Sequence, residues 1–390
     1  LSKHDARGQA RRLLEGGDAE QPSFWNDVAS LGWLGLHLPE AHGGSGFGLE
    51  ELVVVVEQFG RALAPGAFVP TVAASAVIAA AGDDVQARLL PGLADGTVTG
   101  AVALDGDLSL DGGAVSGSAI VIGGGLADVL VVPVGDDVAV IERAASGVTI
   151  DVPTNLDPTR RAARVSFANT PAEVLAGARQ TLVDTARTIY AAEAVGLAGE
   201  CTEQAAAYAR ERQQFGRPIA MFQAVKHHCA NMFVANELAT ADVWDAARAA
   251  AGGGEQFTFA AACAAALAFP AADLCAQLNI QVHGGIGFTW EHDAHLYLRR
   301  ASAVEAVVSA NDAADTATAL TRAGVRRART VDLPPEAEPI RDEVRAFAER
   351  ISGLDAAAQR EALIESGYVM PHWPKPWGRD ASPVEQIIIA

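Results

Sequence analysis

Residues able to do chemistry gather in one segment, "YARERQQFGRPIAMFQAVKH" (residues 208–227), within a stretch whose periodicity is otherwise helical. The segment combines five Lys, Arg or Glu side chains with three glutamines and a Phe-Gly turn at Phe215. Arg212 and Gln223 flank this turn. An arginine beside a Phe-Gly turn is by itself typical of a surface charge at a helix bend, so a binding role requires a second motif elsewhere in the chain.

A metal site is one alternative at the end of this segment, because His227, His228 and Cys229 are ligand types for zinc. Successive helix positions point in different directions, however, so these three side chains cannot converge on one ion. The chain also has four cysteines without a CxxC pair, which argues against a disulfide framework and against a thiolate zinc site. We therefore predict no metal centre.

A second candidate motif is "QVHGGIG" (residues 281–287), which contains Gln281, Gly284 and Gly285. Glycine-rich turns of this kind bind the diphosphate of a dinucleotide when they connect a strand to a helix. Here a helix-like run precedes the glycines and no βαβ unit follows. The sequence therefore argues against a Rossmann site.

Three regions of the sequence, each with its own predicted secondary structure, must form the fold that holds these two motifs. Residues 1–97 have apolar residues three and four apart, which predicts an N-terminal helical domain. Residues 98–170 have short alternating or β-branched runs separated by Gly, Asp and Asn, which predicts a small β-domain. Long Ala- and Leu-rich stretches over residues 171–325 predict four or five packed helices, including residues 257–272 as a buried bundle helix. Residues 326–390 read as a linker and the start of a second helical domain, so the expected fold class is α+β.

Composition narrows the function classes. The formal net charge of -19 and the pI of about 4.8 argue against nucleic acid as a partner, because the chain has no basic stripe that would neutralise phosphates. The sequence does not open with a positively charged region followed by an apolar one, as a secretory signal would. We therefore expect a cytoplasmic protein that acts on a small molecule and does not associate with a membrane.

An internal repeat links the two ends of the chain. The segment "LGWLGLHLPEAHGG" (residues 31–44) matches "SGYVMPHWPKPWGR" (residues 366–379). We expect one constant spacing for the matched pairs, which are Gly32 with Gly367, Pro39 with Pro374, Gly43 with Gly378, and Glu50 with Glu385. By this spacing Ala390 corresponds to Val55, in the middle of an expected helix. The repeat predicts that the chain is the front of a longer tandem protein.

Taken together, the segments resemble the acyl-CoA dehydrogenase family, from about residue 23 to residue 319. In that family a helical domain, a β-domain and a four-helix bundle enclose FAD between subunits. The resemblance implies that the ADP end of FAD is held by Arg212, Phe215, Gln223, Gln281, Gly284 and Gly285. The chemistry suits a diphosphate, which favours a guanidinium fork and backbone N–H groups that no Cβ obstructs.

The sequence departs from the family where the isoalloxazine ring of the flavin would lie. The family has a T-E-P-x-x-G-S-D loop and a K-x-W-I-T-N strand, which cradle this ring. The corresponding run here is "GAVALDGDLSLDGGAVSGSAIVIGGG" (residues 100–125), which has neither motif and a shorter loop. The redox end of the flavin therefore lacks its usual surroundings in this chain.

The catalytic base of the family is also missing. The usual glutamate position falls on Val308, and the position used in some branches falls near Ala186. Asp184 and Glu305 are the nearest carboxylates in the sequence. Removing a proton α to a thioester carbonyl requires a positioned base with a raised pKa, which valine cannot provide. We therefore expect Glu305 to be a solvated or ion-paired helix residue and the chain alone to be inactive.

The resemblance implies the base-lacking half of a tandem, actinobacterial acyl-CoA dehydrogenase. The whole protein would introduce a Cα–Cβ double bond into an acyl-CoA, with a steroid side-chain thioester favoured. It would pass electrons to an electron-transfer flavoprotein and would form a homodimer. Three alternatives remain: a complete dehydrogenase that uses Glu305 or Asp184, an acyl-CoA or nitroalkane-type oxidase, and a non-enzymatic dimerisation scaffold.

Overall fold

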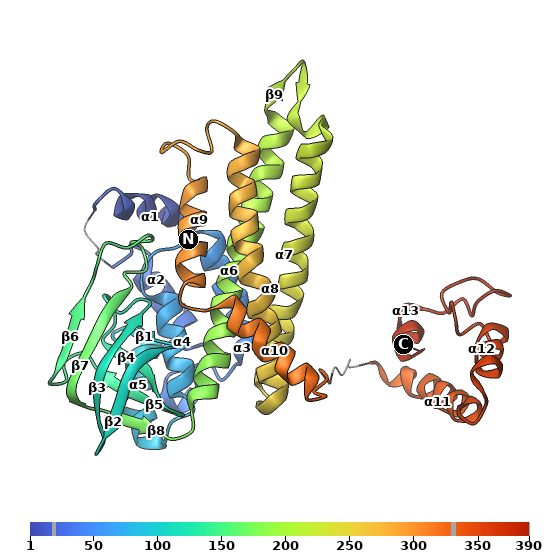
Figure 1. The fold of residues 1–390 in the computed structure, drawn as a ribbon, viewed down its shortest axis with the longest axis horizontal. Coiled ribbons are helices and arrows are strands. Elements are labelled where there is room, and N and C mark those ends of the chain that lie inside the picture. The colour runs from blue at the N-terminus through green and yellow to red at the C-terminus, as the bar shows by residue number, and fades with distance from the viewer. Residues whose placement is uncertain (18–20, 329–332, 390) are drawn as a thin grey trace. The chain divides into compact units, whose positions relative to one another are not determined.

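The computed structural model describes residues 1–17, 21–328 and 333–389. The chain divides into two compact units, unit 1 at Leu1–Arg327 and unit 2 at Ala328–Ala390 (Figure 1). Unit 1 contains helices, then two sheets, then a helix bundle, whereas the described part of unit 2 contains helices only. The expected α+β fold is confirmed.

Unit 1 begins with short helices connected by tight turns. The apolar residues of α3 recur on one face, and Glu51 accepts a 3.0 Å hydrogen bond from the Gly48 N–H at the start of this helix. Helix α4 is apolar all round and is buried on nearly every side, as expected for a core helix. The elements are η1 (Ser2–His4), α1 (Ala6–Leu14), α2 (Trp25–Ser30), η2 (Trp33–Gly35), η3 (Glu40–His42), α3 (Leu49–Arg61), α4 (Phe68–Ile78) and α5 (Asp83–Asp95).

Two four-stranded sheets share a core in the middle of unit 1. Their strand orders are β1-β4-β5-β8 and β2-β3-β7-β6. The sequence suggested that the β-domain ends at residue 170, but strand β8 lies beyond it. Strand β8 belongs to the β-domain because it pairs with β5, with Leu175 opposite Val138. The strands are β1 (Gly100–Val102), β2 (Gly106–Asp111), β3 (Ala114–Val121), β4 (Val129–Val134), β5 (Asp137–Glu142), β6 (Val148–Asp151), β7 (Ala163–Pro171) and β8 (Glu173–Leu175).

The helix bundle is formed by three long helices, α6, α7 and α8, with α9 and α10 packed against α8 (Figure 1). Among the described residues α8 is the one helix long and apolar enough to cross a membrane, but most of its apolar window is buried inside the bundle. The elements are α6 (Arg179–Glu211), β9 (Gln213–Gln214), β10 (Arg217–Pro218), η4 (Ile219–Met221), α7 (Gln223–Ala250), α8 (Gly254–His283), α9 (Ala294–Glu305) and α10 (Ala310–Arg322).

A buried ion network joins the bundle to the β-domain. Arg300 on α9 is fully buried and donates to Glu193 on α6 at 2.5 Å and to Asp157, which lies between β6 and β7. Arg160 also donates to Glu193 and, at 2.9 Å, to the backbone carbonyl of Ala64. Burial opposes the charge on Arg300, but Asp157 and Glu193 raise the pKa of its guanidinium. Two cations and two anions therefore compensate one another away from water.

The described part of unit 2 is a small helical unit. Phe347 and Tyr368 pack with their ring centroids 4.4 Å apart, and Arg379 forms a 2.5 Å ion pair with Glu343. This ion pair is largely exposed, with 60% of the Glu343 side chain accessible to solvent. The elements are η5 (Pro335–Ala337), α11 (Glu338–Ser352), α12 (Ala356–Glu365) and α13 (Pro383–Ile389).

Unit 2 repeats local structure of unit 1, as the matched sequences suggest. Gly32 and Gly367 both end a helix in the left-handed region, with φ values of 71° and 76°. This conformation favours glycine, because a Cβ is rarely tolerated there. Gly367 therefore has the same left-handed conformation after a helix as Gly32. Ala390, which the expected spacing paired with Val55, lies outside the described residues.

The expectation of one constant spacing is wrong beyond residue 377. A Cβ on Gly44 would lie 2.1 Å from the Leu38 carbonyl oxygen, and one on Gly378 would lie 2.4 Å from that of Trp373. Gly378 therefore corresponds to Gly44 and not to Gly43. The cause is one extra residue in the turn of unit 1.

The same shift applies to the helix that follows. Glu385 accepts a hydrogen bond from the Ser382 N–H at 2.6 Å, which is the role of Glu51 at Gly48. Glu385 therefore corresponds to Glu51 and not to Glu50.

Candidate functional site

Both candidate motifs lie at the same end of the bundle. Helix α6 ends at Glu211, α7 begins at Gln223 and α8 ends at His283, so the connection between α6 and α7 and the segment after α8 share this end (Figure 1). The ring of Tyr208 on α6 stacks on that of His283, with centroids 4.3 Å apart. Tyr208 precedes Arg212 by one helical turn, and His283 directly precedes Gly284. The fold thus brings together two motifs that are far apart in the sequence.

The first motif forms a two-residue hairpin between β9 and β10. Phe215 and Gly216 are its turn residues and have φ values of 53° and 76°. Positive φ at both positions is typical of a type I′ turn, but a bulky aromatic residue is rarely found there. The Phe215 side chain is 90% exposed and contacts Phe222 edge to face at 5.9 Å. Its strained backbone and its exposure make Phe215 a candidate for contact with a ligand.

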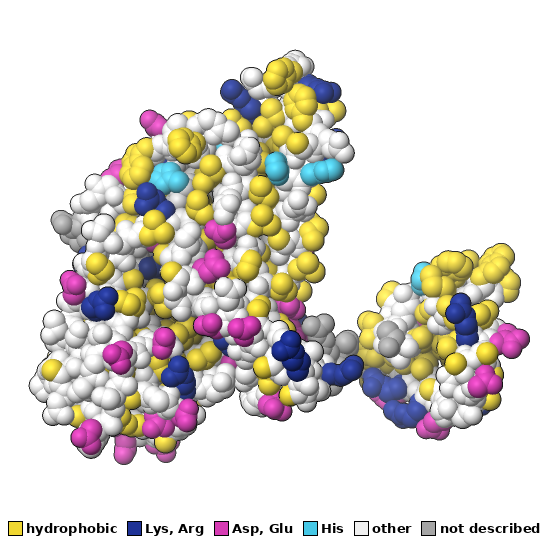
Figure 2. Space-filling model, in the orientation of Figure 1, with side chains coloured by type: hydrophobic (Ala, Val, Ile, Leu, Met, Phe, Trp, Pro, Cys, Tyr) yellow, Lys and Arg dark blue, Asp and Glu magenta, His cyan; other side chains and the backbone are white. Residues whose placement is uncertain are grey.

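Basic side chains lie at the end of α6, in the hairpin and in the first turn of α7. Arg210, Arg212, Arg217 and Lys226 lie close together in the sequence, although the chain as a whole is strongly acidic. Figure 2 shows Lys or Arg side chains at the tip of the bundle, where Figure 1 labels β9. The Arg212 side chain is exposed and forms no hydrogen bond or ion pair among residues 1–17, 21–328 and 333–389. Gln223 opens α7, whose N-terminus has no side-chain cap. Uncapped N–H groups and a guanidinium together favour an anion.

In the second motif, residues 281–287, the backbone of the first two glycines is accessible. Gly284 ends α8 with φ 62° and ψ -134°, a conformation essentially confined to glycine. A Cβ added at Gly284 or Gly285 would meet no atom within 4 Å, so the backbone of both residues faces open space. Gln281 is also exposed. The strand expected of a Rossmann turn is not present, since α8 precedes the glycines.

The glycine that sequence reasoning missed is Gly287. A Cβ there would lie 2.7 Å from the Cβ of His283 and 2.7 Å from the Ile280 carbonyl oxygen. Gly287 is therefore required for the segment to fold back onto the end of α8. The third glycine of "HGGIG" was the available signal, and its role depends on packing that the sequence does not specify.

The tip of the bundle fits the ADP end of FAD. A diphosphate needs cationic donors and backbone N–H groups that it can approach closely. Arg212 and the N-terminus of α7 supply the first, and the open backbone of Gly284 and Gly285 supplies the second. Phe215, Gln223 and Gln281 are exposed around them and would offer an aromatic face and amide groups to the nucleoside.

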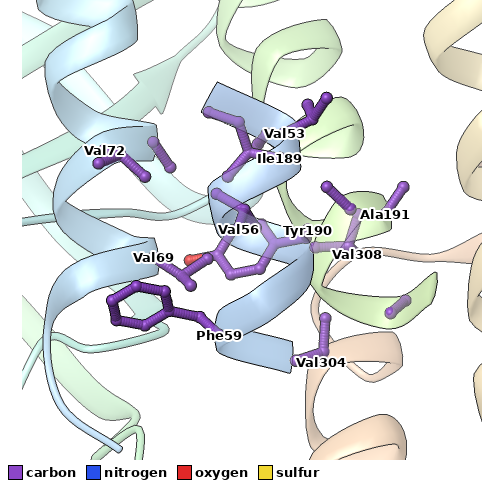
Figure 3. Close-up of a cluster of buried hydrophobic side chains, with 14 of the residues drawn as sticks. Val53, Val56, Phe59, Val69, Val72, Ile189, Tyr190, Ala191, Val304 and Val308 are labelled. Atoms are coloured by element: carbon purple, nitrogen blue, oxygen red, sulfur yellow. The ribbon is translucent and has the colours of Figure 1, made fainter. Parts of the chain in front are cut away.

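The position that the family resemblance assigns to the catalytic base is closed. Val308 follows α9, is 1% exposed, and lies among apolar side chains from α3, α4, α6 and α9 (Figure 3). Tyr190 and Val304 in this cluster are 0% and 3% exposed. A valine in this position cannot accept a proton, and its surroundings leave it out of contact with solvent.

The alternative base position is also apolar, but a buried carboxylate lies near it. Ala186 is fully buried on α6. Asp184 is 2% exposed and accepts hydrogen bonds from Gln180 at 2.8 Å and from Thr258 at 2.6 Å. Burial raises the pKa of the Asp184 carboxyl above its ordinary value, and these two donors only partly oppose the shift. Asp184 lines a cavity of about 440 Å³ that His37 also lines.

Glu305 is half-buried at the end of α9. Burial raises the pKa of its carboxyl, and the nearby like charge of Asp273 adds to the shift. No ion pair of Glu305 is found in the described parts of the chain, so of the two expected states, solvated or ion-paired, the ion-paired one is not seen. Its side chain is three residues from Val308 along the sequence and does not replace it in the apolar cluster.

The three possible metal ligands lie on consecutive positions of α7. His227 is exposed, and His228 and Cys229 are half-buried. Among residues 1–17, 21–328 and 333–389, no group of three or more His, Cys, Asp or Glu side chains is placed to hold a metal ion. Cys201, Cys229 and Cys275 are free thiols in the structure.

Comparison with known families matches most of unit 1. Residues 6–97 match the model described as "Acyl-CoA dehydrogenase, N-terminal domain", and residues 177–307 match "Acyl-CoA dehydrogenase, C-terminal domain". A similar solved structure is the Tcur3481-Tcur3483 steroid ACAD variant, with a TM-score of 0.77 and 29% sequence identity. The match covers 83% of this chain and 94% of that one.

The relatives include two acyl-CoA dehydrogenases of Mycobacterium tuberculosis. The acyl-CoA dehydrogenase FadE34 is 39% identical over 377 residues, which is 95% of this chain and 52% of FadE34, so the chain spans about half of that relative. The acyl-CoA dehydrogenase IpdE2 is 35% identical over 303 residues, covering 77% of this chain and 87% of IpdE2. Fold, family models and relatives agree: the chain belongs to the acyl-CoA dehydrogenase family, whose members are FAD-dependent flavoproteins.

Proposed function

We propose that this chain is the half of a tandem acyl-CoA dehydrogenase that holds the ADP end of FAD and lacks the catalytic base. The observation that carries the proposal is the contrast between two places in unit 1. The tip of the bundle offers an unpartnered Arg212 beside the open backbone of Gly284 and Gly285. At the base position, Val308 is sealed in an apolar cluster.

The reaction of the whole protein is the introduction of a Cα–Cβ double bond into an acyl-CoA thioester. Bound FAD would supply the hydride acceptor. A second half would supply the base that removes the α-proton and the pocket for the isoalloxazine ring. A steroid side-chain thioester is the proposed substrate, because a structure 29% identical to this chain is titled a steroid ACAD. An electron-transfer flavoprotein is the proposed electron acceptor.

The second half is proposed to follow in the same protein. Two observations support this: the chain spans about half of FadE34, and unit 2 begins to repeat unit 1. The outer face of α7 and α8 provides a surface for a partner half, and we propose a homodimer of the full-length protein. The apolar side chains exposed on this face are Phe233, Val234, Leu238, Trp244, Leu267 and Leu274.

The test is the flavin affinity of the full-length protein after Arg212→Ala. A hydrogen bond to a charged group contributes roughly 1.5–3 kcal/mol, so FAD binding is expected to weaken by that amount in an equilibrium titration. Arg248→Ala is the matched control, because Arg248 lies at the other end of α7 and is exposed. Unchanged FAD affinity in the Arg212 variant would remove the ADP-binding assignment.

Flavin stoichiometry tests the division of labour between the halves. If each site uses one half of each kind, the full-length protein should contain about one FAD per chain and not two. The sequence of the second half should carry a glutamate at one of the two family base positions. Two flavins per chain, or a second half without that glutamate, would contradict the proposal.

One observation favours a complete enzyme as the second candidate. Asp184 is a buried carboxyl with a raised pKa beside a cavity, which is the environment that a general base needs. Both of its oxygens are already occupied by hydrogen bonds from Gln180 and Thr258, which makes it the weaker candidate. Acyl-CoA dehydrogenation by this chain alone that Asp184→Asn abolishes would establish this second candidate.

A further inference from the structure

Three aromatic rings are in contact at the tip of the bundle. Tyr208 on α6 lies against His283 at the end of α8, with centroids 4.3 Å apart and an interplanar angle of 27°. The His283 ring also contacts the ring of His292, which precedes α9, with centroids 4.3 Å apart and the rings tilted by 46°. These three residues form the ring stack. The stack connects α6, the end of α8 and the segment before α9, and His283 and His292 stand on either side of Gly284 and Gly285 in the sequence.

Hydrogen bonds define where each histidine in the stack carries its proton. Nδ1 of His283 lies 2.8 Å from the Asn279 carbonyl oxygen, which can only accept, so this Nδ1 is protonated. Nδ1 of His292 accepts a 3.1 Å hydrogen bond from the Ala294 N–H, so it carries no proton. The observed bonds therefore require a neutral His292, with its proton on Nε2.

The surroundings of the pair also favour neutral rings. Burial lowers the pKa of both histidines, and for His292 the adjacent His283 adds to the effect. Asp293 would oppose the shift, but it forms a 2.5 Å ion pair with Arg11 of α1, and this arginine disfavours a further cation.

The remaining neighbour on α9 acts in the same direction. The His295 ring stacks on Trp290 with centroids 5.0 Å apart, and its charge would oppose protonation of His292. A protonated His292 would thus lie near Arg11 of α1, near His283 of α8 and near His295 of α9, which are cations or can become cations.

The ring stack also determines the course of the glycine segment. Gly287 folds back so closely that a Cβ on it would lie 2.7 Å from the Cβ of His283. His283 is therefore held between the Tyr208 ring, the His292 ring and this returning backbone. Of the three residues in between, Gly284 and Gly285 then face open space.

We propose that Tyr208, His283 and His292 are positioning residues, and that their stack holds the Gly284–Gly285 backbone toward the flavin diphosphate only while both histidines are neutral. This inference rests on the function proposed above. Protonating His292 would place a second N–H against the Ala294 N–H and remove the hydrogen bond at the start of α9. Protonating His283 would put a charge between two stacked rings.

The direction of the pH effect follows from the lowered pKa values. A histidine that resists protonation in the folded state stabilises that state less as the pH falls below its unfolded pKa of about 6.5. Acidification through that value should therefore loosen the segment between α8 and α9. Flavin affinity should fall over the same pH range.

Hydrogen exchange of this 390-residue chain tests the ring stack without requiring flavin. Protection factors, which correct for the intrinsic pH dependence of exchange, should fall several-fold for residues 284–294 between pH 7.5 and pH 5.5. His283→Phe keeps a ring in the stack that cannot titrate, so it should reduce this dependence to the part that His292 contributes. His372→Phe in unit 2 is the control and should leave it unchanged. A pH-independent protection factor in the unaltered chain would overturn the inference, as would an unchanged pH dependence in His283→Phe.

A titration of the full-length protein with FAD separates this inference from the proposed function. Affinity is expected to fall several-fold from pH 7.5 to pH 5.5 and to become less pH-dependent in His283→Phe. Tyr208→Ala, which removes one ring, should weaken binding at every pH. FAD binding that is equally tight at both pH values would reject the positioning role and leave the flavin site standing. Loss of protection at low pH in a protein that never binds FAD would instead reject the flavin site.

Discussion

The segment at residues 32–53 and its counterpart in unit 2 share their turns but not their burial. Both begin at a left-handed glycine, and both end with a glutamate that caps the next helix. In unit 1, Leu38 and Val53 are 0% and 2% exposed, because the helices and sheet that follow cover them. The corresponding Trp373 and Ile387 are 46% and 48% exposed.

This difference separates features that the local sequence determines from features that depend on distant parts of the chain. A left-handed glycine and a capping glutamate act within a few residues, so they form wherever the local sequence occurs. Burial of an apolar face depends on elements far along the chain. Unit 2 therefore has the turns of a first domain without the stabilisation that such a domain gains from its neighbours.

The largest effect is expected where the two units differ most, in their charged contacts. Arg300→Ala in unit 1 would leave Asp157 and Glu193 buried without their cation and should destabilise the unit by about 3–5 kcal/mol. Arg379→Ala in unit 2 removes a largely exposed pair and should cost no more than about 1 kcal/mol. Denaturant unfolding of both variants measures the two costs. If the two variants lose similar free energies of unfolding, the buried ion network does not stabilise unit 1 more than the exposed ion pair stabilises unit 2.

A smaller effect is expected from matched truncations of α3 and α13. Val53→Ala should destabilise unit 1 by about 2 kcal/mol, because it removes two methyl groups from a packed core. Ile387→Ala, its counterpart, should change stability by less than about 0.5 kcal/mol in this chain. The same pair of variants in a full-length tandem protein sharpens the comparison. If a second copy covers unit 2, the cost of Ile387→Ala should rise toward that of Val53→Ala.

The smallest effect is expected at Glu305. If the second half carries the base, Glu305→Gln in the full-length protein should leave turnover nearly unchanged, whereas loss of a general base costs roughly 10²–10⁴-fold. The measurement is kcat with a saturating acyl-CoA. A loss in that range would place the chemistry in this half and refute the proposed division of labour.

Much of the fold could be read from the sequence, and the reasons are local. Helical spacing indicated α3 and the long bundle helices, and alternation with Gly, Asp and Asn indicated the strands. The limit of the β-domain was harder to place, because β8 is a strand only through its pairing with β5. The one-residue shift in the repeat was missed for a similar reason, since Gly44 and Gly378 are matched by contacts with a carbonyl oxygen and not by sequence identity alone.

The candidate site divides in the same way. The sequence by itself determined which residues could hold an anion at Arg212 and Gly284, and that Val308 cannot take a proton, because these depend on side-chain chemistry. Only the tertiary structure decided that the two motifs meet at one end of the bundle, since that requires α6 and α8 to pack side by side. It also decided that Val308 is sealed and that Arg300 is buried among carboxylates, because both depend on residues more than a hundred positions away.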